Sequence, residues 1–490
     1  MTIQTQTRKG IERSDDEARQ WWLFCLIVVA LKFVLLALDP LPKLFIGDSA
    51  CYISTALVGW IPDDRSYFYG YVIRWVALST GSLTSLLVWQ TLISALTVLL
   101  FTHTCRSILG LPARSSYLLG FLCALDPLQL VWERYVMTET ISLFFYMAVL
   151  YYSFLYLKHR AIRHLAIVQG LAILLIGFRM SYLLLVQISA VLLPLLAFTP
   201  LLLAAWRNRR SIPAVLLRPL KLVSLHVVAS IALMLLLHGA YRQVNGLLCD
   251  RAPAYLYATG LHLLAFWAPI LVPADASDER LAQIIKEGDK FDIKELTARN
   301  DQRFAEGYLV PRWQEEEPDV EDANQIAKET ALHALRRDPL GVLNLAVRTF
   351  AQYWNVKDIQ HYASIDLGHN DIPDEQRTIL VEEFHFSTDG RVVGAPPTLL
   401  QRWFLLSWPY GWFLLLSPFL GAWTVYLTRE KEIALLLLLQ LGIILSVTFT
   451  FAVAPSLRYL QPASLLALLT IALCLRGGSA GEATEEPVRA

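Results

Sequence analysis

Residues 22–40 read WLFCLIVVALKFVLLALDP, and FIGDSACY follows at residues 45–52. The first stretch is apolar enough to cross a bilayer as a helix, which takes about 20 residues. Asp48 lies just past the end of this stretch. A partly dehydrated carboxylate at the mouth of a membrane span is costly, so such a residue is a candidate for a functional site. The two stretches together predict a membrane protein with a site near Asp48.

The composition of the whole chain also indicates insertion into a lipid bilayer. Of the 490 residues, 55% are hydrophobic and 17% are charged, and the mean hydropathy is +0.46. Few soluble proteins have this balance. The formal net charge is zero, which gives no support for nucleic-acid binding. The expected partner is therefore the bilayer, and no nucleic-acid partner is expected.

The fold class predicted is an α-helical polytopic membrane protein with about ten transmembrane helices. The apolar runs are 22–40, 83–104, 115–131, 139–157, 163–179, 182–205, 220–240, 403–427, 433–453 and 459–475. The first run is expected to be a retained span, because the polar stretch before it shows no small-residue cleavage site. The run 252–273 contains Pro253, Pro269 and Pro273. We expect it to be interfacial or re-entrant.

Basic residues gather in alternate loops, which predicts a cytoplasmic N-terminus by the positive-inside rule. The inner loops contain Arg8, Lys9, Arg106, Lys158, Arg160, Arg207, Arg209, Arg210, Arg429 and Lys431. Asp48, the loop 131–138, Arg179 and Arg458 then share the outer face. The predicted location is the cell inner (plasma) membrane, with the site on its extracytoplasmic face.

This topology divides the chain into regions. They are a cytoplasmic N-terminus (1–21), a transmembrane module (22–240) with a first outer loop (47–82), an extracytoplasmic domain (241–402), C-terminal transmembrane helices (403–475) and a cytoplasmic tail (476–490). The extracytoplasmic domain holds 26 acidic and 17 basic residues, a net charge of −9, which is typical of a water-facing region. It mixes short helical patterns with loops. In the first outer loop, Ala50–Trp60 and Tyr67–Leu78 predict helices that lie in the interface plane.

Polar residues from separate segments are expected to meet on the outer face, although each also has an ordinary explanation. The ordinary alternative for Asp48 is a helix N-cap, and that for Glu139 is an acid at a helix start. Glu133 with Arg134 would form an exposed ion pair that adds little to stability. The side chains of Arg179 and Arg458 would also be stable if they snorkelled to the interface.

The order of five sequence features resembles a known family. They are Asp48 with Tyr52; Pro62–Tyr67 with Tyr69-Gly70-Tyr71; Pro127–Glu139; Arg179; and Arg458-Tyr459-Leu460-Gln461-Pro462. In this order they resemble the GT-C superfamily of polytopic membrane glycosyltransferases, in particular the protein O-mannosyltransferases and aminoarabinose transferases. The chain departs from the family at Gly70-Tyr71, where a Tyr-Pro pair is often found.

The resemblance implies transfer of a monosaccharide from a polyprenyl-phosphate donor to a hydroxyl of a glycolipid, polysaccharide or protein. It implies that the 22–240 module is catalytic. The expected catalytic residues are Asp48, as general base, and Glu139. The residues expected to bind the donor phosphate are Arg65, Arg179 and Arg458. Those expected to contact the sugar or acceptor are Tyr52, Glu133 and Tyr459. No metal-ligand spacing is visible in the sequence, and use of a divalent metal stays open.

The chemistry of such a transfer needs few protein groups. The departing phosphate develops negative charge, which arginines stabilise in a water-poor site. A positioned carboxylate that removes the acceptor proton contributes about 10²–10⁴-fold to the rate. One direct displacement inverts the anomeric centre. The alternatives are a non-catalytic transporter of lipid-linked saccharides and a GT-C-like polymerase or ligase of longer lipid-linked glycans.

Overall fold

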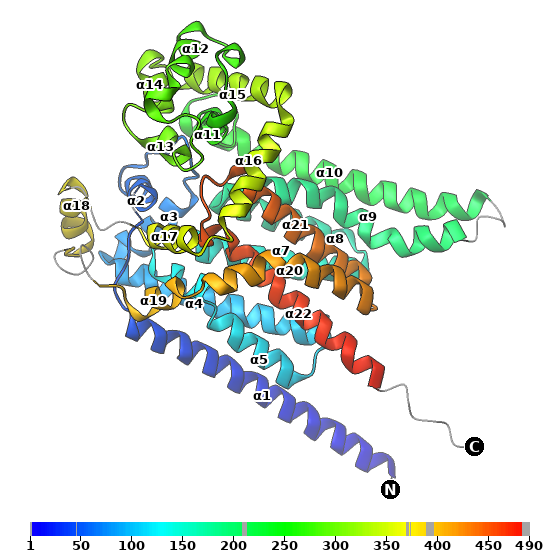
Figure 1. Ribbon diagram of the computed structural model, residues 1–490. Helices are drawn as coiled ribbons and strands as arrows, with labels where there is room; N and C mark the ends of the chain where they lie inside the picture. Colours follow the sequence, from blue (N-terminus) through cyan, green and yellow to red (C-terminus); the bar gives the residue numbers. More distant parts are fainter. Residues whose placement is uncertain are drawn as a thin grey trace.

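The computed structural model describes residues 2–45, 47–207, 213–368, 372, 374–388 and 396–482. Within these ranges the chain is helical, and its extended pairing is limited to one bridge between Lys43 and Tyr135. Long helices run side by side, and a group of shorter helices covers one end of them (Figure 1). The N-terminal end of α1 and the C-terminal end of α22 both point to the opposite end. Arg209 and Arg210 lie outside the described residues.

The long helices form the membrane module. They are α1 (Thr2–Leu38), α4 (Leu83–His103), α7 (Glu139–His159), α8 (Ile162–Phe178), α9 (Leu183–Arg207), α10 (Pro213–Cys249), α20 (Trp408–Leu427), α21 (Lys431–Phe451) and α22 (Gln461–Glu482). In the described part of the chain, eight helical segments are long and apolar enough to cross a bilayer. The protein is therefore an α-helical polytopic membrane protein.

By helix length and apolar composition, the predicted count of about ten spans is too high. Two segments explain the difference. Helix α8 is apolar but has only 17 residues. The run 115–131 is not one helix, because α5 (Ala113–Ala124) ends early and a four-residue helix, α6 (Pro127–Leu130), follows. Asp126 caps α6 by accepting a hydrogen bond from the Leu128 N–H at 2.8 Å. An N-cap followed by proline starts a new helix at that point.

The first outer loop forms two helices, as predicted, namely α2 (Asp48–Val58) and α3 (Phe68–Val76). They pack closely because Gly70 faces Thr55. A Cβ placed on Gly70 would lie 2.4 Å from the Thr55 Cβ, which only a glycine avoids. Gly70 thus allows the two helices to touch.

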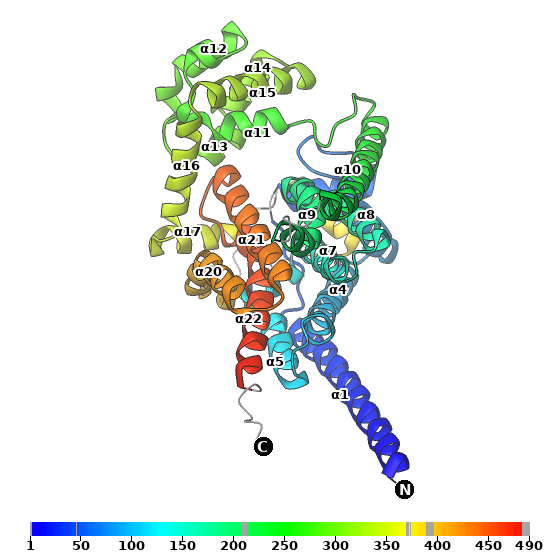
Figure 2. The same ribbon diagram turned by 90° about the vertical axis from the view of Figure 1, so that its right-hand side faces the viewer.

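Most of the segment 241–402 is a set of short helices. They are α11 (Thr259–Phe266), α12 (Glu279–Lys286), α13 (Arg299–Phe304), α14 (Leu309–Glu316), α15 (Val320–Arg337), α16 (Pro339–Gln352), α17 (Val356–Asp366), α18 (Asp374–Phe384) and α19 (Leu399–Leu405). Figure 2 shows α16 and α17 descending from the upper helices beside α21. We call α11–α17 the outer domain.

The run 252–273 contains α11, so most of it belongs to this outer domain. Leu261, Leu264 and Leu271 are buried in a core that also includes residues of α14 and α15. These buried leucines pack against other helices of the domain. The expected position of the run at the membrane interface stays a prediction.

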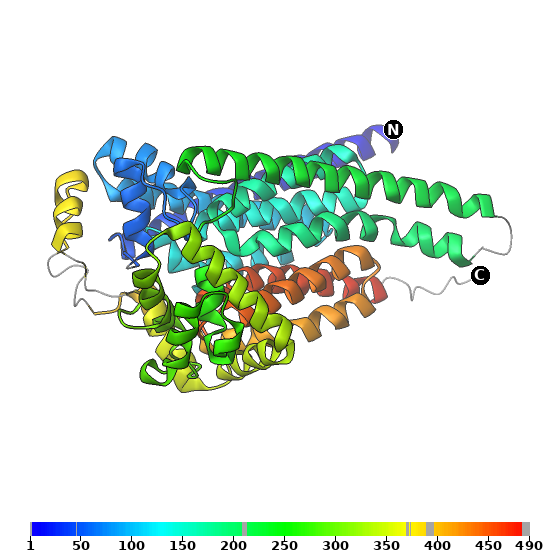
Figure 3. The ribbon, with the colours of Figure 1, turned by 90° about the horizontal axis from the view of Figure 1, so that it is seen from above.

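Two boundaries of the predicted regions also shift. Helix α10 continues to Cys249, past the expected end at residue 240, and it runs beside α9 (Figure 3). At the other boundary, α19 ends at Leu405 and the apolar helix α20 begins at Trp408. Residues 250–258 join α10 to the outer domain, and residues 367–407, which include α18 and α19, join the outer domain to α20.

Candidate active site

The segment before Asp48 is fixed by pairing with the second outer loop, residues 131–138. The Lys43 N–H donates to the Arg134 carbonyl at 2.7 Å, and the Val136 N–H donates back to the Lys43 carbonyl at 2.9 Å. Gly47 then turns the chain with φ +85°, a left-handed conformation that glycine adopts without steric cost. Gly47, not Asp48, occupies the N-cap position of α2. The N-cap explanation of Asp48 is therefore wrong.

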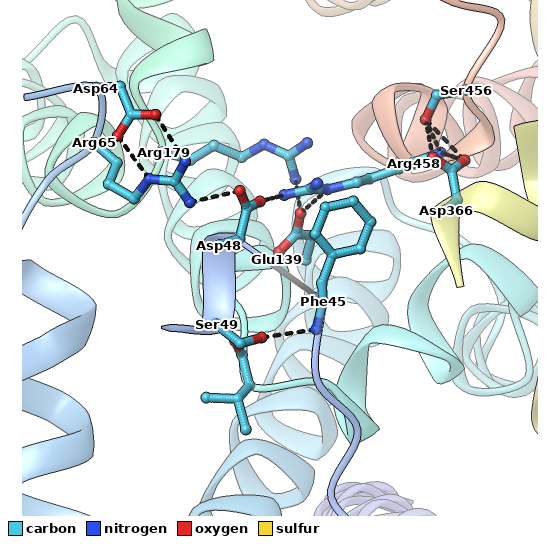
Figure 4. A network of polar contacts seen from close by, with 11 residues as sticks. Phe45, Asp48, Ser49, Asp64, Arg65, Glu139, Arg179, Asp366, Ser456 and Arg458 are labelled. Atoms are coloured by element: carbon cyan, nitrogen blue, oxygen red, sulfur yellow. Dashed lines mark hydrogen bonds and ion pairs between the residues drawn. The ribbon is translucent and has the colours of Figure 1, made fainter. Parts of the chain in front are cut away.

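Asp48 lies between two arginines from distant parts of the chain (Figure 4). Its Oδ1 accepts a hydrogen bond from Arg65 Nη1 at 2.5 Å, and its Oδ2 accepts one from Arg458 Nη2 at 2.7 Å. Arg65 also donates to both oxygens of Asp64, from Nε at 2.9 Å and from Nη2 at 2.8 Å. The Asp48 carboxylate is thus held in place from both sides.

Glu139 extends this arrangement toward α9. Its Oε1 accepts a hydrogen bond from Arg458 Nε and lies 3.3 Å from Arg179 Nη1. The Glu139 side chain is fully buried. The Arg458 guanidinium carbon lies 4.8 Å from the centre of the Phe45 ring and 5.8 Å from that of Trp132, which favours a cation at this point.

We call these six residues the carboxylate–arginine cluster: Asp48, Asp64, Glu139, Arg65, Arg179 and Arg458. Three carboxylates face three arginines, so the formal charge of the cluster is zero. The sequence placed Asp48, Glu139, Arg65, Arg179 and Arg458 on one face, and the structure brings all five into contact distance. Asp64, which was not among the predicted site residues, belongs to the same cluster.

The electrostatics of the cluster keep Asp48 ionised. Burial raises the pKa of this carboxyl, but the charges of Arg458 and Arg65 and their hydrogen bonds outweigh burial and lower the pKa to about 2. Arg179 differs from the other two arginines. Within the described part of the chain, its buried Nη1 has no hydrogen-bond partner, although it lies near Glu139. It is the arginine least committed to a carboxylate.

The segment that carries Arg458 is anchored by Asp366, a residue that sequence reasoning missed. Asp366 ends α17 and is buried. It accepts hydrogen bonds from Ser456 Oγ at 2.7 Å and from the Arg458 N–H at 3.3 Å. Burial is the largest effect on the Asp366 carboxyl and raises its pKa to about 6. Through this contact the outer domain positions Arg458.

Glu133 does not join the cluster. It is fully buried between helices, where its Oε1 accepts hydrogen bonds from Lys32 Nζ and Ser94 Oγ, each at 2.6 Å. Arg134 is also fully buried, so the interpretation as an exposed pair is wrong. The predicted role of Glu133 as a sugar or acceptor contact is at odds with this position, because helices cover Glu133 on all sides. An unpaired lysine inside a membrane span is energetically unfavourable, and the ion pair with Glu133 compensates the charge of Lys32.

The two predicted tyrosines border the cluster in different ways. Tyr52 is buried under Arg65, whose guanidinium carbon lies 5.8 Å from the ring centre. Tyr69 meets the same ring edge to face, with centroids 5.1 Å apart. Tyr459 instead lines a cavity beside the cluster. Of the two, Tyr459 is the residue within reach of a bound molecule.

A cavity of about 1200 Å³ opens next to the cluster, between the membrane module and the outer domain. Asp64, Arg179 and Tyr459 line it on the cluster side. One wall is apolar and comes from α9 and α21; its residues include Leu183, Leu184, Ile443, Ile444, Val447 and Phe451. The opposite wall is polar and comes from α11 and α15. The cavity therefore suits a molecule that is apolar at one end and polar at the other.

Metal binding has no obvious site among the described residues, where no three His, Cys, Asp or Glu side chains are grouped as ligands. The carboxylates of the cluster point at arginines instead.

Comparisons of this chain with protein-family models, with curated proteins and with solved structures find no match.

Proposed function

We propose that this protein is an inverting glycosyltransferase that uses a polyprenyl-phosphate sugar as donor, at the extracytoplasmic face of the plasma membrane. The observation that carries the proposal is the position of Asp48 between Arg65 and Arg458, beside a cavity that Arg179 lines. A carboxylate, several arginines and an apolar wall are what this reaction needs in one place.

The donor has an apolar chain and an anionic phosphate. The apolar wall formed by α9 and α21 suits the chain, because burying hydrocarbon stabilises the complex by about 25 cal/mol per Å². Arg179 stands at the end of that wall, and its Nη1 makes an ion pair with Glu139 at 3.3 Å but no hydrogen bond among the described residues. It is the arginine that supports phosphate binding best, since Arg65 and Arg458 already hold carboxylates.

The proposed step forms one bond and breaks one bond. The acceptor oxygen attacks the anomeric carbon while the bond from that carbon to the phosphate oxygen breaks. Asp48 takes the acceptor proton, and the electron pair leaves on the phosphate, where Arg179 and Arg458 stabilise it. Attack opposite to the leaving group inverts the anomeric configuration.

A base with a pKa of about 2 is weak, so its activation has to follow donor binding. The cluster is neutral before the donor binds, and the phosphate adds negative charge beside it. The arginines are then shared between the phosphate and Asp48, which raises the basicity of Asp48 in the complex. Deprotonation is thereby linked to the presence of the donor.

The experiment is a transfer assay with the purified full chain in lipid nanodiscs and a radiolabelled polyprenyl-phosphate sugar. Asp48→Asn keeps the shape of the side chain and removes the base, so transfer should fall about 10²–10⁴-fold while donor binding is retained. Asp289→Asn, an exposed site in the outer domain, is the matched control and should keep full activity.

Full transfer activity in Asp48→Asn would show that Asp48 is not the base. A second outcome would replace the proposal altogether. Movement of a lipid-linked saccharide across the membrane without a new glycosidic bond would identify a transporter.

A further inference from the structure

The polar wall of the cavity takes no part in the proposed step at Asp48. It is built from α11 and α15 of the outer domain. On α15 the residues that face the cavity include Glu321, Asn324, Gln325 and Lys328. Positions three and four apart lie on one side of a helix, so this wall is one continuous helix face. Polar side chains gathered on one side of a cavity indicate a second binding region.

The wall is held rigid by close packing of α11 on α15. A Cβ placed on Gly260 would lie 2.0 Å from the Asn324 carbonyl oxygen, so the two backbones touch. The Gly260 N–H donates to Asn324 Oδ1 at 2.7 Å. A rigid wall can orient a ligand without losing conformational entropy on binding.

His262 is the residue of α11 best suited to contact a ligand. It lines the cavity and is partly exposed. Arg303 Nε donates a hydrogen bond to His262 Nδ1 at 3.2 Å, which leaves the proton of the neutral ring on Nε2. Burial and the charge of Arg303 lower the pKa of His262 to about 4, so the ring is neutral at physiological pH. His262 is thus a fixed, uncharged hydrogen-bond donor.

The lining also provides aromatic surface. The His262 ring stacks on Phe266, with centroids 5.6 Å apart and planes at 28°. Phe266, Tyr255 and Tyr257 all line the cavity. Aromatic rings offer an apolar face beside polar groups, an arrangement that suits a molecule with both C–H and O–H surfaces.

The formal charge of the whole lining is zero. Its acidic residues are Asp64, Glu321 and Asp322, and its basic residues are Arg179, Arg242 and Lys328. Because the donor phosphate already uses Arg179, this lining offers no excess positive charge for a second anion. An anionic acceptor is disfavoured on that ground.

A peptide acceptor is disfavoured for another reason. Extended peptides are commonly bound by pairing with an exposed strand, and the described residues contain no strand beside the cavity. A hydroxyl-rich neutral molecule needs donors, acceptors and aromatic faces together. The wall supplies all three.

We propose that the acceptor is an uncharged glycan, whose terminal sugar lies against His262 and Phe266 in the outer wall of the cavity. This inference rests on the proposed transferase function and specifies its acceptor. The glycan enters from the outer-domain side, and its free hydroxyl points past Asp64 toward Asp48. The donor chain occupies the opposite, apolar wall.

The test uses the purified full chain in nanodiscs, a radiolabelled undecaprenyl- or decaprenyl-phosphate sugar, and an envelope extract separated into three fractions. The fractions are uncharged glycans, phosphorylated glycolipids and proteins. Label in the uncharged glycans is the expected result. Label in either other fraction would overturn the acceptor assignment and leave the transferase function standing. No transfer to any fraction would overturn both.

Variants of His262 test its contact with the glycan. His262→Leu should raise the KM for the glycan about tenfold, the loss expected for one hydrogen bond, with a smaller change in the KM for the donor. His262→Gln keeps an N–H donor and should recover part of the loss. His361→Leu, exposed on α17, is the control and should behave as wild type. An unchanged KM for the glycan in His262→Leu would exclude this contact.

Discussion

Arg458 Nη2 donates a hydrogen bond to Asp48 Oδ2 at 2.7 Å, although 410 positions of sequence separate the two residues. The same guanidinium also binds Glu139 through Nε. One arginine from the start of the last span therefore fixes two carboxylates from the first and second outer loops. The fork of an arginine allows this, whereas a lysine has a single charged nitrogen.

Arg458→Lys should impair transfer strongly because an ammonium group cannot reach both carboxylates with the same geometry. We expect transfer to fall at least about 10²-fold, since the loss of one charge-stabilising donor costs that much in other enzymes. The measurement is the transfer rate of purified protein whose elution profile and Tm show that it is folded.

Arg402→Lys is a suitable control for that variant because Arg402 is exposed on α19, outside the cluster. Equal activity of Arg458→Lys and Arg402→Lys would mean that the bridging of the two carboxylates is not needed.

The pH dependence should differ between kcat/KM and kcat. In the free protein the pKa of Asp48 is lowered to about 2, so the carboxylate is ionised above that pH and should give no acid limb in kcat/KM between pH 4 and 7. In the complex, the bound phosphate competes with Asp48 for the arginines, which raises the pKa of Asp48. The acid limb of kcat should therefore lie at higher pH than that of kcat/KM. Steady-state kinetics from pH 4 to 9 would test this. Identical acid limbs in both profiles would contradict it.

Asp366 should make stability depend on pH. Its folded-state pKa of about 6 lies above the ordinary value of 3.8, so its contribution is present below pH 3.8 and is lost as pH rises through 6. The size of this loss is on the order of 3 kcal/mol. In Asp366→Asn the ionisation is gone while an oxygen still accepts from Ser456 and Arg458. The difference in Tm between pH 5 and pH 8 should shrink in this variant, and an unchanged difference would refute the assignment.

The buried pair of Lys32 and Glu133 should be essential to the membrane module. Removing one partner leaves an unpaired charge among helices, which costs about 3–5 kcal/mol. Lys32→Met and Glu133→Gln should each lower the Tm in detergent, and the double variant should lose less than the sum of the two. Lys431→Met, at an exposed helix end, is the control. Additive losses would show that the two side chains do not interact.

Much of the candidate site was predictable because membrane topology restricts where polar residues can lie. Asp48, Glu139, Arg179 and Arg458 sit at the outer ends of apolar runs, and loop charges placed those ends on one side. The helices of the first outer loop were likewise visible as short apolar patterns. These are properties of single segments, which a sequence carries directly.

The sequence did not reveal contacts that depend on how distant helices pack together. Lys32 is visibly unusual in an apolar run, but its partner Glu133 depends on how α1, α4 and the second outer loop meet. Asp366 and His262 lie in helices with ordinary polar patterns, and nothing marks them until the outer domain is folded. The break at Asp126-Pro127 was the missed local signal, because a capping residue followed by proline ends an apolar run as a helix.

The stereochemistry of the product shows whether Asp48 acts as a base in a single displacement. The measurement is the anomeric configuration of the transferred sugar by NMR, compared with that of the same sugar in the polyprenyl-phosphate donor. With Asp48 as a base and one displacement, the product should have the opposite configuration. A product with the donor's configuration, or no new glycosidic bond from protein that binds the donor, would contradict the account.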